Sequence, residues 1–241
     1  MQQSLYVALS GQVARERRLE TVAHNVSNIN TPGFRAAGIS FSAELARTGG
    51  VQTAFSWEGP DFISQRNGSL TKTDNPLDVA TRGNAWFGIK TETGPAYTRD
   101  GRMRMAETGA LETINGDAVL DAGGGPIILD TAAGAPQIAP DGMITQGGKQ
   151  LAAIGLFALD PAARLSRSAG SSVVSSAAAT AVLDFSVNGV AQGYIETSNV
   201  DPVLEMTKMI SLSREYEAIN TTIFQTESSL RDAIKTLAAN S

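Results

Sequence analysis

Residues 201–239 read DPVLEMTKMISLSREYEAINTTIFQTESSLRDAIKTLAA, and their apolar residues repeat over four heptads, the strongest structural signal in the chain. Two series carry the repeat, the second three residues behind the first: Met209, Tyr216, Ile223, Leu230 and Leu237, then Leu212, Ile219, Thr226 and Ala233. Only Thr226 is polar, and such sustained spacing of three and four residues is typical of a coiled coil. Asp201 as the cap and Pro202 as the first helical residue mark the start of the helix.

Residues 3–29 show a weaker version of the same pattern. Leu5, Leu19, Val22 and Val26 occupy heptad positions, but two of the eight positions carry the polar residues Gln12 and Arg15. Thr31-Pro32-Gly33 should end this helix, because proline restricts the residue before it and glycine favours a turn. We expect the two terminal helices to form an antiparallel, coiled-coil-like pair.

The middle of the chain has the pattern of short strands separated by turns. Asp100-Gly101, Asn115-Gly116 and Asp141-Gly142 stand among turn signals that recur every seven to eleven residues, with short apolar runs between them. Asp-Gly and Asn-Gly between such runs are strong hairpin signals. The predicted fold class is therefore α+β, with a central all-β domain of short antiparallel strands between the two helices.

Four segments follow from these changes of pattern. They are an N-terminal helical assembly segment (1–35), an extended connector (36–70), a central β domain (71–196) and a C-terminal helical assembly segment (197–241).

The length of the C-terminal helix suggests assembly. A helix over 203–238 would be about 54 Å long, whereas a domain of about 125 residues is only about 35 Å across. Met206, Ile210, Phe224 and Ile234 also lie off the main seam, so we expect neighbouring molecules to cover them. The predicted assembly interface comprises Leu5, Leu19, Val22, Val26, Met209, Leu212, Tyr216, Ile219, Ile223, Leu230 and Leu237.

Composition narrows the chemistry. The 241 residues include no cysteine and one histidine, His24, which excludes disulfides, thiol catalysis and cysteine-ligated metals and disfavours a histidine triad. A net charge of −5 makes nucleic acid a poor candidate for the partner, and no stretch is long and apolar enough to span a membrane. We expect no enzymatic activity, no cofactor and no bound metal.

Three stretches resemble the flagellar axial proteins, the family of rod and hook subunits. The first is Ala23-His24-Asn25-Val26-Ser27-Asn28-Ile29-Asn30-Thr31-Pro32-Gly33-Phe34-Arg35. The second runs from Asn75-Pro76-Leu77-Asp78 through Trp86-Phe87 to Tyr97-Thr98-Arg99-Asp100-Gly101, and the third from Gln192 to Val200 and on through Glu205-Met206. The signature residues are Asn25, Asn28, Thr31, Gly33, Phe34, Ser198, Asn199, Val200, Glu205 and Met206.

The resemblance implies a structural subunit of the basal-body rod, a helical tube that transmits torque across the periplasm. Its implied partners are other rod proteins and copies of itself, reached through flagellar type III export without a cleaved signal. The modest length resembles a proximal-rod subunit more than a distal-rod subunit or the longer hook protein.

Two other classes of function remain open. A carboxylate-based hydrolase would need a cleft with two carboxyl groups roughly 5–10 Å apart. A glycan-binding β domain on a coiled-coil stalk would need an exposed aromatic cluster, although aromatic residues make up only 6% of the chain.

Overall fold

The computed structural model describes residues 2–48 and 51–239, and within them a mostly β chain carries one helix near each end. The helices are α1 (Gln2–Ser27) and α2 (Pro202–Ala239), close to the predicted 3–29 and 201–239. The strands, in chain order, are β1 (Ala37–Thr48), β2 (Val51–Ile63), β3 (Leu70–Lys72), β4 (Val79–Arg82), β5 (Ala85–Thr91), β6 (Gly94–Thr98), β7 (Met103–Met105), β8 (Leu111–Thr113), β9 (Ala118–Val119), β10 (Gln137–Ile138), β11 (Met143–Gln146), β12 (Lys149–Ala153), β13 (Leu156–Ala158), β14 (Leu165–Arg167), β15 (Val173–Ser175), β16 (Thr180–Ala181), β17 (Gly189–Gln192) and β18 (Tyr194–Glu196).

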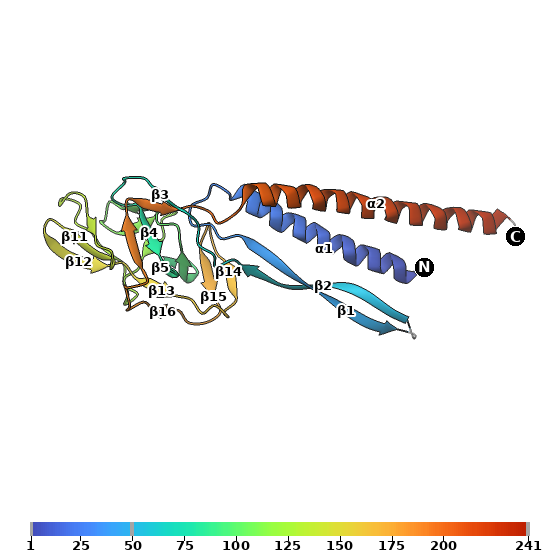
Figure 1. The fold of residues 1–241 in the computed structure, drawn as a ribbon, viewed down its shortest axis with the longest axis horizontal. Coiled ribbons are helices and arrows are strands. Elements are labelled where there is room, and N and C mark those ends of the chain that lie inside the picture. The colour runs from blue at the N-terminus through green and yellow to red at the C-terminus, as the bar shows by residue number, and fades with distance from the viewer. Residues whose placement is uncertain (1, 49–50, 240–241) are drawn as a thin grey trace. The chain divides into compact units, whose positions relative to one another are not determined.

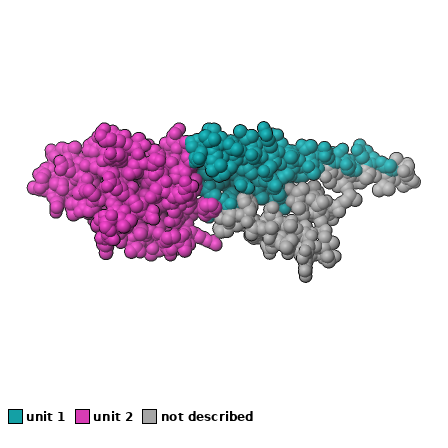
Figure 2. All heavy atoms as spheres, viewed as in Figure 1, with its two compact units in different colours: residues 1–27, 37–61, 201–241 teal, residues 28–36, 62–200 magenta. Residues whose placement is uncertain are grey.

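The chain divides into two compact units, which Figure 2 colours separately. The helical unit contains residues 1–27, 37–61 and 201–241, and the β unit contains residues 28–36 and 62–200. Both units are therefore discontinuous in the sequence, because each is built from segments that flank the other.

In the helical unit, α1 and α2 lie side by side and run in opposite directions (Figure 1). Between them in the sequence, where the residue pattern suggests a connector, β1 pairs with β2. Val22 and Leu212 are buried between the elements of this unit, with exposed fractions of 5% and 4%.

The predicted α+β fold with a coiled-coil-like helical pair is wrong. The chain has two helices within 2–48 and 51–239 and is otherwise mostly β, and among the described side chains polar contacts interrupt the apolar heptad positions. Gln12 and Arg15 contact α2 through hydrogen bonds, whereas the apolar Leu9 and Val13 are 50% and 52% exposed. A coiled coil needs apolar knobs on both helices, and α1 supplies too few of them.

The β unit is organised around β5. This strand pairs antiparallel with β6, β9 and β13, and the sheet continues in the order β14-β15-β6-β5-β9-β8-β7. Smaller ladders join β10-β11-β12, β17 to β4, and β18 to β3. All these pairs are antiparallel, as the frequent turn signals predict.

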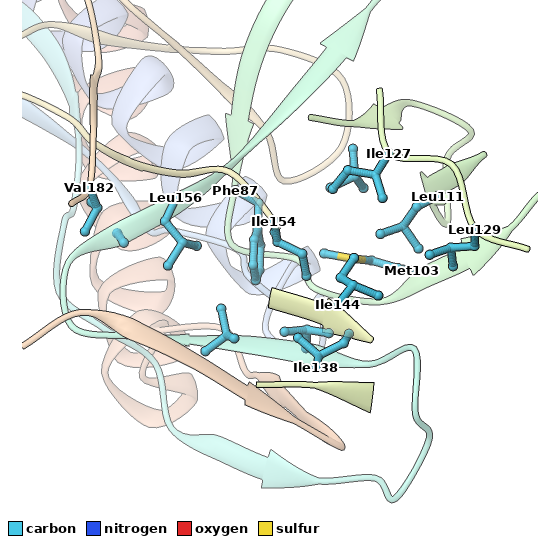
Figure 3. Packing of buried hydrophobic residues seen from close by; sticks show 14 residues of the cluster. Phe87, Met103, Leu111, Ile127, Leu129, Ile138, Ile144, Ile154, Leu156 and Val182 are labelled. Carbon is cyan, nitrogen blue, oxygen red and sulfur yellow. The ribbon is translucent and has the colours of Figure 1, made fainter. Parts of the chain in front are cut away.

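The core of the β unit is apolar and lies against β5 (Figure 3). Phe87 on β5 is fully buried, as are Ile144 on β11 and Val119 on β9. Figure 3 shows the side chains of Phe87 on β5, Leu156 on β13 and Ile154, just before β13, close together, although β5 and β13 are far apart in the sequence. Burying one such side chain contributes about 1.5–3 kcal/mol.

One predicted hairpin turn is wrong. β6 and β7 flank Asp100-Gly101, but the sheet order places them apart and they do not pair. A Cβ on Gly101 would lie 1.6 Å from the Val79 carbonyl oxygen. Glycine stands there because β4 passes close to the backbone, a requirement that local sequence cannot reveal.

Candidate functional site

An exposed apolar row runs along α2 in the helical unit. Met206, Ile210 and Phe224 are 51%, 56% and 70% exposed, and their spacing places them on one side of the helix. Exposed large apolar side chains gathered on one face are a feature of interaction surfaces.

The predicted interface residues divide into three groups. Val22 and Leu212 are buried. The half-buried ones are Leu19, Val26, Met209, Tyr216, Ile219 and Ile223. Leu5, Leu230 and Leu237 lie outside the residues whose side chains the structure describes.

Polar contacts cross between the helices. The Gln12 amide donates to the Tyr216 hydroxyl at 3.3 Å and to Asn220 Oδ1 at 2.8 Å. One turn further along α1, Arg15 Nε lies 3.0 Å from Glu215 Oε2. The two polar heptad positions of α1 therefore meet polar partners on α2.

Asn25 holds the last turn of α1. Its side chain accepts from the Ala37 amide and donates to the Ala37 carbonyl, both at 2.9 Å. It also donates to Glu205 Oε2 at 3.2 Å, and Lys208 contacts the other oxygen of that carboxylate at 2.6 Å. Asn25 and Glu205 are 2% and 6% exposed, so both signature residues cross-link the helical unit internally.

In the β unit, residues 28–36 are hydrogen-bonded to residues 196–200. Gly33 donates its amide to the Glu196 carbonyl at 2.8 Å, and Asn199 donates its amide to the Phe34 carbonyl at 3.2 Å. The Asn199 side chain accepts from the Ala36 amide at 2.7 Å. The signatures near the two ends of the chain thus meet in space.

Gly33 is sterically required. Its φ is 67°, and a Cβ there would lie 2.2 Å from the Asp100 amide nitrogen. Phe34 beside it is 1% exposed and lies under the Arg167 guanidinium, 4.1 Å from the ring centroid. The Ser198 hydroxyl oxygen accepts a hydrogen bond from the Val200 amide at 3.3 Å.

Two buried arginines share one carboxylate beneath these segments. Arg35 Nη2 lies 2.8 Å from Glu196 Oε1, and Arg99 Nη1 lies 3.0 Å from Glu196 Oε2. All three side chains are at most 2% exposed. Arg35 and Arg99 also lie 5.5 Å and 5.4 Å from the centroid of the Trp86 ring, within cation–π distance.

Burial opposes the charge of both arginines. Loss of hydration lowers the pKa of Arg99 to about 10 and also lowers the pKa of Arg35, while the attraction of Glu196 partly offsets this effect. Arg99 therefore stays charged at neutral pH. Removing one partner of such a buried pair costs about 3–5 kcal/mol, so the cluster ties residue 35, the β6 end and β18 together.

Sequence reasoning missed Arg99, Glu196 and Trp86 as interacting residues. Each stands inside a recognised motif, but the three are separated by 13 to 110 positions in the sequence. No local pattern could have found this cluster, because its residues meet only when distant segments fold together.

Metal binding and membrane insertion are two further possibilities for the described residues. Among the described residues no group of three or more His, Cys, Asp or Glu side chains could hold a metal ion. Over the same part of the chain, neither helix has the length and apolar character needed to cross a membrane. The buried charged side chains Arg35, Arg99 and Glu196 form ion pairs with one another.

Three family models match the chain, one near each end and one in the middle. "Flagella basal body rod protein" matches residues 5–35, "Flagellar hook protein FlgE/F/G D1 domain" matches 80–146, and "Flagellar basal body rod FlgEFG protein C-terminal" matches 191–237. These matches cover the helices, the central strands and the two signatures that meet in the β unit.

Several known proteins are similar to this chain over its full length. The chain is 46% identical to the flagellar basal-body rod protein FlgF of Mesorhizobium japonicum and 43% identical to that of Rhizobium meliloti, each over 100% of both chains. It is 33% identical to FlgF of Caulobacter vibrioides over 98% of both chains.

Proposed function

Because the chain belongs to the flagellar basal-body rod family, we propose that it is a structural subunit of the rod, of the FlgF type. Full-length similarity to three FlgF proteins supports this assignment. A rod subunit acts by packing against its neighbours and passing torque along the structure, so catalytic groups are not required.

The terminal helices are the proposed assembly elements. The observation that carries this proposal is the apolar row Met206, Ile210 and Phe224, exposed although it lies on a helix with a second apolar side. We assign the interface to the terminal segments, 1–35 and 197–241, with the central strands as the attached body. The proposed interface combines this row with the residues predicted from the sequence, of which Val22 and Leu212 are buried within the helical unit and would support the surface from inside: Leu5, Leu19, Val22, Val26, Met209, Leu212, Tyr216, Ile219, Ile223, Leu230 and Leu237.

The partners proposed are other rod proteins and copies of the same chain. We further propose delivery by the flagellar type III export apparatus and a position in the periplasmic part of the basal body. Family membership supports both proposals. The same membership supports the absence of enzymatic activity.

Ile210→Asp tests the assembly role. Ile210 is 56% exposed in the single chain, so the variant should keep its folded structure, while a carboxylate buried in an assembled interface is strongly unfavourable. We expect normal thermal unfolding of the purified protein, with loss from isolated basal bodies and loss of motility.

Ser211→Asp is the matched control, because Ser211 is exposed but lies off the apolar row. This variant should assemble. Normal incorporation of Ile210→Asp would contradict the proposed interface.

A further inference from the structure

Between residues 9 and 15 of α1, two polar side chains contact α2 while two large apolar side chains are exposed. Gln12 and Arg15 contact α2, whereas Leu9 and Val13 are about half exposed. Burial of apolar surface favours the opposite arrangement. The polar contacts accompany this rotation of α1, together with the burial of Ala14 and Val22.

These contacts agree on one register. In an antiparallel helix pair, the residue numbers of facing partners have a constant sum. That sum is 230 for Arg15 with Glu215 and also for Asn25 with Glu205. For Gln12 with Tyr216 and with Asn220 it is 228 and 232, which brackets the same value.

We propose that Gln12 and Arg15 are positioning residues that fix the register and the rotation of α1 on α2. Asn25 sets this register at the base of the pair, and Gln12 and Arg15 set it again three turns away. In this rotation Leu9 and Val13 face outward, where they become available to a second subunit; only this last step rests on the proposed function.

The apolar repeat of α2 could not fix the register alone. Since Met209, Tyr216 and Ile223 recur every seven residues, a slip by one heptad would preserve that face of α2. The polar positions remove this ambiguity. A slip in one direction would place Arg15 opposite Lys208, and a slip in the other would place Glu215 opposite the buried Val22.

The Arg15 and Glu215 side chains are both partly exposed, so their ion pair selects the register of the helices more than it stabilises the fold. Arg15 and Glu215 have side chains that are 37% and 52% exposed, and such pairs contribute little to folding. Polar residues that select one register among several are an attested use of this kind of contact.

Thiol cross-linking of the full chain tests the proposal, and the absence of natural cysteines makes it specific. Gly11→Cys with Ile219→Cys forms a reporter pair whose numbers also sum to 230. The new Cβ at Gly11 would lie 3.4 Å from Arg15 Nη1, an ordinary contact. A short bifunctional thiol reagent should join the two positions within one chain.

Arg15→Glu in this background should lower the yield of the cross-link about two- to five-fold, because it places two carboxylates together. The double variant Arg15→Glu/Glu215→Arg should restore the yield by restoring the charge pair. Arg214→Glu, which makes a similar charge change at an exposed neighbouring position, should leave the yield unchanged.

An unchanged yield in Arg15→Glu, or a double variant as poor as the single one, would overturn the proposal. Incorporation into basal bodies should follow the same order as cross-linking. If the cross-linking results hold while a chain lacking 202–239 still assembles, the proposed assembly role of α2 fails and the positioning role stands.

Discussion

At single residues, the role of the signature positions is structural: their side chains make contacts that hold the fold together. Asn199 joins three backbone and side-chain groups, accepting from Ala36 and donating to Ser64 and Arg66. Gly33 is the position where a backbone conformation and a close approach coincide. Each such residue holds separate parts of the chain together, so its role is visible only when both parts are present.

Comparison of Gly33→Ala with Gly134→Ala separates the cost of the backbone conformation from the cost of the close approach. Both glycines have positive φ, 67° and 79°, but a Cβ on Gly134 would meet nothing within 4 Å. We expect Gly134→Ala to cost about 1–2 kcal/mol for its backbone conformation alone. Gly33→Ala should cost at least about 3 kcal/mol, because its Cβ also collides with the backbone at Asp100.

Urea unfolding followed by circular dichroism measures this difference. Equal losses in the two variants would show that residues 28–36 move away from Asp100 at little cost.

At the scale of elements, the end of α1 is joined to the start of β1 by one side chain. Asn25 makes paired hydrogen bonds to the backbone of Ala37 and a third bond to Glu205. The helix thus ends at Ser27 with its last turn already fixed to the strand that follows. Both partners of Asn25 belong to the helical unit.

Asn25→Ala should therefore loosen this junction. The Ala37 amide and one Glu205 oxygen would lose a buried partner, at a cost of about 1–3 kcal/mol. Hydrogen exchange should show faster exchange of the Ala37 amide.

Asn30→Ala is the control, because Asn30 is exposed and follows the same helix. It should leave exchange at Ala37 unaffected. Unchanged protection of that amide in Asn25→Ala would mean that the paired hydrogen bonds do not hold β1.

At the scale of the whole molecule, two discontinuous units share one chain. The helical unit buries Leu212, whereas the β unit has its own core around Phe87. Because each unit has separate apolar packing, damage to one core need not spread to the other.

Leu212→Asp tests this independence. The buried carboxylate should expose the helices to solvent, at a cost of about 3 kcal/mol or more within that unit. Segment-resolved hydrogen exchange should show lost protection in α2 and unchanged protection in β5. Ser211→Asp should change neither, and loss of protection in β5 as well as α2 would show that the two units unfold together.

Local structure and family membership could be predicted from the order of the residues alone. Heptad spacing and the Asp201-Pro202 start predict a helix that the structure begins at Pro202. Glycine-centred signals predict short antiparallel strands, and the recognised motifs predict membership of the rod family, which the comparisons confirm. Helices and hairpins depend on residues a few positions apart, and the family motifs are short contiguous stretches that can be recognised directly in the sequence.

The contacts between these parts could not be predicted in the same way. The heptads of α2 wrongly suggest a coiled coil, because Gln12 and Arg15 on the partner helix replace apolar knobs with polar contacts. The position of Glu196 between Arg35 and Arg99 also has no local signal. A buried charge is tolerated only where its partners converge from distant segments, and that convergence is a property of the fold, not of any stretch of sequence.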